Sequence, residues 1–179
     1  MYVSIDIEAD GPIPGDYSML SIGAVVINPS QPHFANAFYR KLAPISSFYN
    51  LEALKYSGFE RDETIGFDNP IHVMRDFKDW LELKREDHNG NKKIMFLADN
   101  AGFDWMFICW YFHHFIGENP FGYSCTSLTS LFKGISKNMS KSFKHLRKTK
   151  HTHNALDDAM GNAEAFIKII DKYDLKINL

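Results

Sequence analysis

Three strand-like segments separated by turn signals fill the first forty-two residues and limit the folds that this chain can adopt. Apolar residues alternate with polar ones, or run together, over Tyr2–Ile7, Met19–Ile27 and Phe34–Leu42. Breaks rich in proline, glycine and asparagine lie between them at 10–15 and 28–32. Because short breaks of this kind join neighbouring antiparallel strands, we predict a three-stranded antiparallel meander.

Helix patterns alternate with short strand patterns in the rest of the chain. Pro70 fits the first turn of an amphipathic helix that carries Val73, Phe77 and Leu81 at helical spacing. The apolar run at 94–98 is typical of a strand buried on both faces. The other expected elements are helices at 51–56, 103–116, 128–132 and 155–173, a strand near 123–125 and a loop at 85–93. This order predicts an α/β or α+β fold, and we expect one domain over residues 1–179 because no linker-like stretch interrupts it.

The composition is that of an ordinary folded domain. Of the 179 residues, 45% are hydrophobic, 23% charged and 15% aromatic, which excludes disorder as the main state. No apolar run approaches the ~18 residues of a membrane span, and no signal stretch opens the chain, so we expect a cytoplasmic protein without membrane association. Two cysteines, Cys109 and Cys125, are too few for a disulfide framework and are expected to be core thiols.

Positive charge is concentrated in one segment of an otherwise acidic chain. Between Lys133 and His153 there are seven basic residues and no acidic one, whereas the net formal charge of the whole chain is −2. This asymmetry favours a polyanionic partner such as a nucleic acid. A solvated basic loop is the alternative, and charge alone does not exclude it.

Two acidic residues interrupt the first apolar strand. Asp6 and Glu8 lie two positions apart, so the pleat directs both side chains to the same face while Ile5 and Ile7 point to the other. Aspartate and glutamate are poor strand formers, and two neighbouring carboxylates repel each other. Binding of a hard divalent cation through oxygen ligands would explain the pair, and a solvated edge strand is the alternative.

Other acids and one histidine lie at the beginnings of predicted helices. Asp104 opens the aromatic helix and Asp158 lies in the first turns of the last helix, where the helix dipole favours an anionic side chain. Capping would explain Asp104 by itself. His153 precedes the last helix directly after the basic segment.

The order and spacing of these groups resemble the three motifs of the DEDDh 3′→5′ exonucleases. Asp6-x-Glu8 is followed by Asn100-x-x-Phe103-Asp104 and then by His153-x-Ala155-x-x-Asp158. The resemblance extends from the first strand to the last helix. It implies a ribonuclease-H-like fold with a five-stranded mixed sheet flanked by helices. It also implies an active site formed by Asp6, Glu8, Asp104, Asp158 and His153.

The sequence departs from the family pattern at two positions, and in the third motif two neighbouring aspartates compete for one role. Asp99 stands where the family often has histidine, and Ser21 where relatives often have glutamate. Asp157 and Asp158 are neighbours on a helix and point ~100° apart, so only one can face the site, and the spacing from His153 selects Asp158.

The chemistry implied is phosphodiester hydrolysis. Two Mg²⁺ or Mn²⁺ ions held by the four acids would stabilise the attacking and leaving oxygens of an in-line displacement. His153 would accept the proton of the attacking water at neutral pH. The resemblance implies that a nucleoside 5′-monophosphate is released from a single-stranded 3′ end.

Substrate contacts are expected around these groups. The backbone at Ala9 and Gly11 would lie beside the terminal sugar, Asn100 beside the substrate, and Phe103 and Trp105 are candidates for base stacking, although each is also a candidate core residue. Basic side chains expected to bind phosphates are Lys144, Arg147, Lys148 and Lys150.

The substrate and the assembly remain open at this stage. We expect RNA to be favoured over DNA, because the chain is compact and shows no segment for docking to a polymerase. The alternatives are a DNA 3′-end trimming or proofreading exonuclease and a non-catalytic nucleic-acid-binding domain of the same fold. The resemblance also implies a possible homodimer.

Overall fold

The protein is built on a five-stranded mixed sheet with the strand order β3-β2-β1-β4-β5. The computed structural model describes residues 1–29, 36–87 and 93–177. Strands β1 (Tyr2–Ala9), β2 (Met19–Val26) and β3 (Ala37–Lys41) form the expected antiparallel meander. Strand β4 (Met95–Ala98) is parallel to β1, and β5 (Cys125–Ser127) is parallel to β4. The beginning of the predicted third strand, at 34–35, lies outside the described residues.

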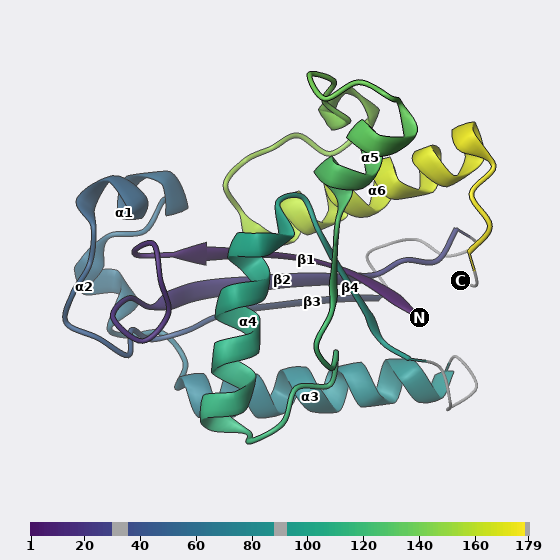
Figure 1. Ribbon diagram of the computed structural model, residues 1–179. Coiled ribbons are helices and arrows are strands. Elements are labelled where there is room, and N and C mark those ends of the chain that lie inside the picture. Colours follow the sequence, from purple (N-terminus) through teal and green to yellow (C-terminus); the bar gives the residue numbers. More distant parts are fainter. Residues whose placement is uncertain (30–35, 88–92, 178–179) are drawn as a thin grey trace.

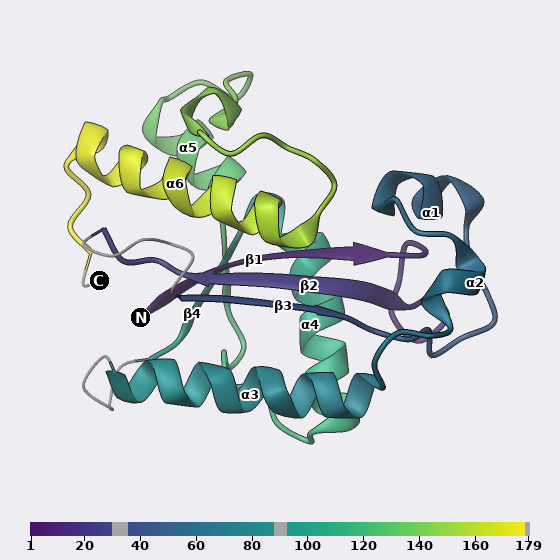
Figure 2. The ribbon, with the colours of Figure 1, turned by 180° about the vertical axis from the view of Figure 1, so that it is seen from behind.

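Helices cover both faces of this sheet (Figures 1 and 2). Helices α3 (Pro70–Asp87) and α4 (Ala101–Phe115) pack on one face, and α5 (Leu128–Ile135) and α6 (Ala155–Tyr173) on the other. Helix α1 (Leu51–Ser57) and the short α2 (Arg61–Thr64) lie beyond the carboxyl end of β1. A 3-10 turn, η2 (Lys144–Leu146), precedes α6.

The boundaries differ from the predicted ones at several ends. Helix α4 begins at Ala101 rather than 103, and the last strand lies at Cys125–Ser127 rather than near 123–125. Helix α3 continues through Asp87, so the predicted loop at 85–93 is helical at its start, and its middle, 88–92, lies outside the described residues. In the described ranges, no helix is long and apolar enough to cross a membrane.

Strand β1 divides its side chains between the two faces of the sheet. Val3, Ile5 and Ile7 are buried in the larger core, together with aromatic residues of α3 and α4 such as Phe77 and Phe107. The alternate residues face α6, where the Ser4 hydroxyl donates to the Ala159 carbonyl at 2.8 Å. The acids of β1 therefore lie between the sheet and α6, as the period of two predicts.

A glycine in β2 allows α6 to approach the sheet closely. Gly23 pairs with Asp6 across the β1–β2 ladder. A Cβ atom at Gly23 would lie 2.3 Å from the carbonyl carbon and oxygen of Ala155, closer than real Cβ contacts allow. The absence of a side chain at Gly23 thus lets the first turn of α6, with Asp158, lie directly over Asp6.

The prediction that both cysteines are core thiols is wrong. Cys125 is exposed, because β5 is a short edge strand whose outward positions meet solvent, and Cys109 is only partly buried on α4. Neither forms a disulfide.

Candidate active site

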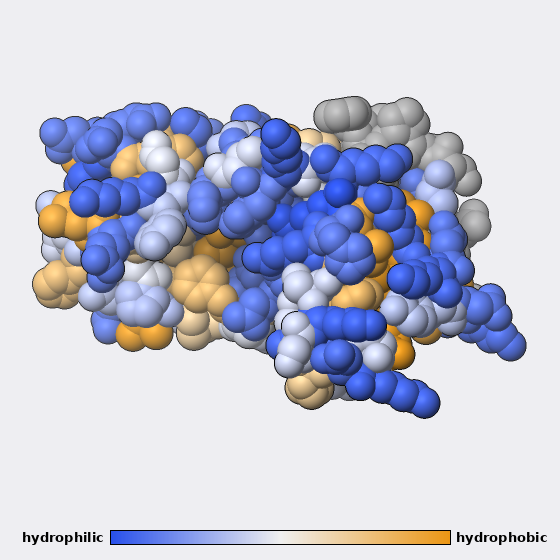
Figure 3. All heavy atoms as spheres, turned by 90° about the horizontal axis from the view of Figure 1, so that it is seen from above, coloured by the Kyte–Doolittle hydropathy of each residue, from blue (hydrophilic) through white to orange (hydrophobic). Residues whose placement is uncertain are grey.

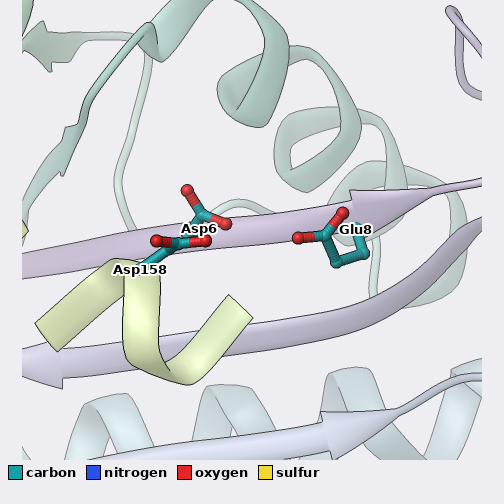
Figure 4. A group of neighbouring side chains, drawn as sticks. All are labelled: Asp6, Glu8 and Asp158. Atoms are coloured by element: carbon teal, nitrogen blue, oxygen red, sulfur yellow. The ribbon is translucent and has the colours of Figure 1, made fainter. Parts of the chain in front are cut away.

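Three carboxylates converge between β1 and the first turns of α6. One oxygen from each of Asp6, Glu8 and Asp158 lies within 4.8 Å of the others. Figure 4 shows the Asp6 and Asp158 carboxylates beside each other, with Glu8 further along β1 toward its carboxyl end. The pleat of β1 and the close approach at Gly23 together produce this cluster.

Asp104 approaches the same point from the opposite face of the sheet. Strand β4 pairs with β1 only through Tyr2–Ser4, and beyond that point the two parallel strands separate. Asp104, in the first turn of α4 and only 6% exposed, fills this opening, and its Oδ1 accepts a hydrogen bond from the Ile7 amide at 3.1 Å. Its charge raises the pKa of Asp6, although its oxygens are not among those that lie within 4.8 Å of one another in the cluster of Asp6, Glu8 and Asp158.

The carboxyl groups of this centre disfavour one another's ionisation. Burial raises the pKa of Asp6 well above its usual value, and the charges of Asp104, Asp158 and Glu8 raise it further. Burial, followed by the charges of Asp158 and Asp104, raises the pKa of Glu8 to about 8. Burial also raises the pKa of Asp104 to about 7. A group of acids held this close is stabilised by a bound cation, which removes the repulsion.

The two oxygens of Asp158 have different surroundings. Its Oδ1 accepts from Arg147 Nη1 at 3.1 Å and lies 2.6 Å from His151 Nδ1. Its Oδ2 is buried and has no hydrogen-bond partner in the described part of the chain. A buried carboxylate oxygen without a partner, beside two further carboxylates, fits the donor set of a hard divalent cation.

The neighbouring Asp157 points elsewhere. Its Oδ2 accepts from the Thr152 hydroxyl at 2.8 Å, on the loop before α6. The structure therefore places Asp158, and not Asp157, among the acids, as the spacing from His153 predicts.

His153 lies on the exposed loop that leads into α6, with a left-handed backbone (φ 57°). Its ring centroid is 5.8 Å from that of Tyr56 on α1 and 4.3 Å from that of His151. The sequence prediction missed His151, the histidine that contacts Asp158. The His-Thr-His pattern of residues 151–153 was the available signal.

A cavity of about 430 Å³ adjoins Glu8. It lies between the end of β1, helix α1 and the first turn of α4, and it contains the predicted residues Ala9, Gly11 and Phe103. The prediction did not include the cavity residues Pro12, Asn50, Glu52, Ala53 and Tyr56. Sequence periodicity predicts α1 as a helix, but does not show against which part of the sheet it packs.

Gly11 has a structural explanation in addition to the one expected. A Cβ atom there would lie 1.9 Å from the Tyr17 ring, so the tyrosine occupies the space that the missing side chain leaves. The nearby Asp10 is also structural, since its buried carboxylate pairs with Arg61 at 2.7 Å.

Two predicted substrate residues are placed differently. Trp105 packs against the larger core, with its ring edge-on to Phe96 at 5.1 Å, and does not line the cavity. Phe103, which is 37% exposed, is the aromatic residue of α4 at the cavity. Asn100 is exposed directly before α4, and its side chain makes no capping hydrogen bond.

Hydrogen bonds hold the basic segment against α6. The Glu164 carboxylate accepts from the backbone amides of Lys148 and Thr149 at 2.7 and 2.8 Å, and Lys168 donates to the Leu146 carbonyl at 2.7 Å. Hydrophilic side chains cover most of the face that includes this segment (Figure 3).

Arg147 differs from the other predicted phosphate-binding residues. Lys144, Lys148 and Lys150 are exposed, whereas the Arg147 side chain is 5% exposed and contacts Asp158. The expected phosphate contact of Arg147 does not fit this position, because its guanidinium already has carboxylate partners inside the protein.

Known proteins similar to this chain are nucleases. The family model of the 3′-5′ exoribonuclease Rv2179c-like domain matches residues 1–170. The chain is 37% identical over 190 residues to the 3′-5′ DNA exonuclease Cap18 of Escherichia coli, covering 100% of this chain and 96% of that protein.

Solved structures share the fold at lower identity. The nuclease domain of 3′hExo, a DEDDh family member bound to rAMP, has a TM-score of 0.76 and 18% identity, covering 99% of this chain and 96% of that one. E. coli exonuclease I in complex with a dA16 oligonucleotide has a TM-score of 0.73 and 14% identity, covering 96% of this chain and 41% of that one. The five-stranded sheet with its flanking helices is thus the ribonuclease-H-like fold of these nucleases.

Proposed function

Because the chain belongs to the Rv2179c-like 3′-5′ exoribonuclease family and is a 3′-5′ exonuclease of the DEDDh type, we propose that it releases nucleoside 5′-monophosphates from single-stranded 3′ ends, with RNA favoured over DNA. One observation carries the proposal: the carboxylates of Asp6, Glu8 and Asp158 converge, with Asp104 nearby. This centre adjoins a cavity that we expect to receive the 3′ end of a nucleic acid strand.

Asp6, Glu8, Asp104 and Asp158 would hold two divalent cations, Mg²⁺ or Mn²⁺. The unpartnered Asp158 Oδ2 and the mutual repulsion of the carboxylates support this assignment. When bound, the cations supply charge that stabilises the attacking and leaving oxygens of a phosphoryl displacement. Their ligands must be ionised, so cation binding and proton release are coupled.

His153 accepts the proton of the attacking water in this proposal. The water oxygen forms a bond to the phosphorus that joins the last two nucleotides, and the bond from this phosphorus to the 3′ oxygen of the preceding nucleotide breaks. The 3′ oxygen takes up a proton from solvent to become a hydroxyl, and the terminal nucleotide leaves as a 5′-monophosphate. His153 is exposed and its ring lies beside Tyr56, which lines the cavity, and this neighbourhood supports the role assigned to it.

The cavity would receive the terminal nucleotide. Phe103 and Tyr56 offer ring surface to a base, and the backbone at Ala9 and Gly11 offers polar groups to the sugar. Asn100, the exposed residue directly before α4, would also contact the substrate. Lys144, Lys148 and Lys150 would contact phosphates upstream of the scissile bond.

The similar proteins differ in the nucleic acid that their descriptions name. The family description names an exoribonuclease, which supports RNA. The relative at 37% identity is described as a DNA exonuclease, so DNA 3′-end trimming is the second candidate. The family membership speaks against a non-catalytic binding domain. A homodimer, a cytoplasmic location and a single domain over 1–179 stay predictions from the sequence.

One assay separates these candidates. Matched 5′-labelled single-stranded RNA, single-stranded DNA and duplexes are incubated with Mg²⁺, Mn²⁺ or chelator, and products are resolved on a denaturing gel. We expect stepwise shortening of single strands from the 3′ end, faster for RNA, and none with chelator. Faster shortening of DNA would establish the second candidate, and shortening in chelator would contradict the metal assignment.

A further inference from the structure

The Arg147 guanidinium lies among three side chains of the candidate site. Nη1 donates to Asp158 Oδ1 at 3.1 Å, Nη2 donates to Asn162 Oδ1, and Nη2 lies 3.8 Å from Asp99 Oδ2. A planar guanidinium fork spreads its donors over separate nitrogens in fixed directions, whereas the three donors of an ammonium group share one nitrogen. Only 5% of the Arg147 side chain is exposed, although the neighbouring lysines are exposed.

The structure makes room for this arginine. A Cβ atom at Gly161 would lie 3.0 Å from Arg147 Cδ and 3.1 Å from the Thr149 carbonyl oxygen, so a glycine on α6 accommodates the arginine stem. The guanidinium carbon also lies 5.7 Å from the centre of the Phe143 ring. Contacts therefore hold the stem and the terminal nitrogens of Arg147, while its Nε has no hydrogen-bond partner in the described residues.

These contacts determine which oxygen of Asp158 is available. Arg147 and His151 occupy Oδ1, while Oδ2 is buried without a partner in the described residues. A carboxylate fixed through one oxygen cannot rotate freely, so the other oxygen keeps its direction. Groups that hold a metal ligand from behind commonly contribute 10–100-fold to metal affinity.

We propose that Arg147 is a positioning residue that fixes the Asp158 carboxylate and leaves Oδ2 for the cation. The inference rests on the proposed metal-dependent function and assigns Arg147 to the metal centre rather than to the nucleic acid. The competing possibility is that Arg147 acts only as a positive charge among the acids. In that case its removal would strengthen cation binding, because one repelling charge is lost.

Binding of Mn²⁺ to the intact protein without nucleic acid tests the proposal by calorimetry. We expect Arg147→Met to raise the Mn²⁺ dissociation constant by about 10–100-fold. Arg147→Lys keeps the positive charge but not the planar guanidinium, and we expect its Mn²⁺ binding to be weaker than that of the wild type as well. Lys148→Gln removes the same charge from the adjacent exposed position and should bind Mn²⁺ as the wild type does. Wild-type or tighter binding by Arg147→Met, or full affinity in Arg147→Lys, would overturn the proposal.

Gly161→Ala provides a second variant if Arg147→Met does not fold. Its methyl group requires the Arg147 stem to shift by a few tenths of an ångström without changing any charge, and we expect a folded protein, by circular dichroism, with weakened Mn²⁺ binding. A folded Gly161→Ala protein with wild-type Mn²⁺ affinity would contradict the positioning role. Failure of the proposed function looks different, because the wild type would then bind no Mn²⁺, or Asp158→Asn would bind it unchanged.

Discussion

Asp157 and Asp158 are adjacent carboxylates with different partners, and this contrast gives the first prediction. Asp158→Asn removes ligand charge from the acid cluster at little cost in volume and should abolish most turnover. Asp157→Asn disturbs the contact with Thr152 and should be mild. Steady-state rates on a labelled oligonucleotide compare the two. A greater loss in Asp157→Asn would show that the functional register of α6 is the other one.

Substitutions of the two loop histidines, His151 and His153, should impair different steps. Because His153 has a left-handed backbone, asparagine is the replacement best tolerated there. His153→Asn should slow turnover by ~10²–10⁴-fold with Mn²⁺ affinity retained, as expected for loss of a general base. His151→Ala loses the contact with Asp158 and should weaken Mn²⁺ binding while keeping turnover at saturating Mn²⁺. Kinetics and calorimetry on both variants check this, and exchanged phenotypes would make His151 the proton acceptor.

The sequence could place individual site residues where a periodic pattern determines the direction of their side chains. The period of two in β1 predicts that Asp6 and Glu8 share a face. The helical period shows that only one of Asp157 and Asp158 can face the site, and the motif spacing from His153 selects Asp158. No periodic rule shows that Arg147 is the buried cation of the basic segment, because its burial depends on Gly161 and Asn162 across α6. Trp105 was similarly ambiguous, since an aromatic residue beside a motif can face either the core or the cavity.

At the scale of elements, the contact between β2 and α6 leaves no room for added volume at Gly23. Gly23→Ala would place a methyl group 2.3 Å from the Ala155 backbone, so α6 must move away from the sheet. We expect a loss of ~1–3 kcal/mol, as for overpacked cores, together with weaker Mn²⁺ binding through Asp158. Thermal unfolding and calorimetry measure both effects.

Gly134→Ala is the matched control for this change. Gly134 lies within α5, and a Cβ atom there has nothing within 4 Å. Alanine is favoured over glycine in a helix, so this variant should be as stable as the wild type or slightly more so. If the two alanine variants were equally stable, the close approach would not limit the position of α6.

The basic segment should contribute a measurable salt dependence. Lys144, Lys148 and Lys150 are exposed, and each phosphate contact on a single strand should contribute ~0.7 to the slope of log affinity against log salt. Replacing all three with Gln should flatten that slope and raise KM for long substrates, and leave cleavage of a dinucleotide nearly unchanged. Salt titrations with Ca²⁺ in place of the catalytic metal provide the comparison. Superimposable slopes would mean that these lysines form a solvated surface.

At the scale of the whole molecule, the raised pKa values predict how stability without metal depends on pH. Folding raises the pKa of Glu8 from 4.5 to about 8 and that of Asp104 from 3.8 to about 7. The folded state therefore binds more protons than the unfolded state between these values, and stability falls as pH rises through this window. The stabilising contribution is complete below pH ~4 and lost above pH ~8.

Thermal unfolding in chelator across this window should show a falling Tm, and the slope should be smaller in Glu8→Gln. In saturating Mn²⁺ the decline should disappear, because the cation binds the ionised carboxylates. A Tm in chelator that rises from pH ~5 to pH ~8 would contradict the assigned shifts.

The sequence predicted the order of the strands in the meander and the major helices, because these depend on local patterning. It did not predict how α1 borders the cavity or that Cys125 is exposed, because both follow from which elements lie at the edge of the sheet. Packing between elements distant in sequence determined these features.

The acid centre joins β1 (Tyr2–Ala9), near the beginning of the chain, to α6 (Ala155–Tyr173), near the end of the given sequence. During synthesis on the ribosome, Asp6 and Glu8 emerge early, but the centre is complete only after Asp158 has emerged and α6 has packed over Gly23. A growing chain that holds only the first four strands therefore lacks one side of its cation site. We therefore expect cleavage that depends on this centre to begin only after α6 has been synthesised and has packed on the sheet.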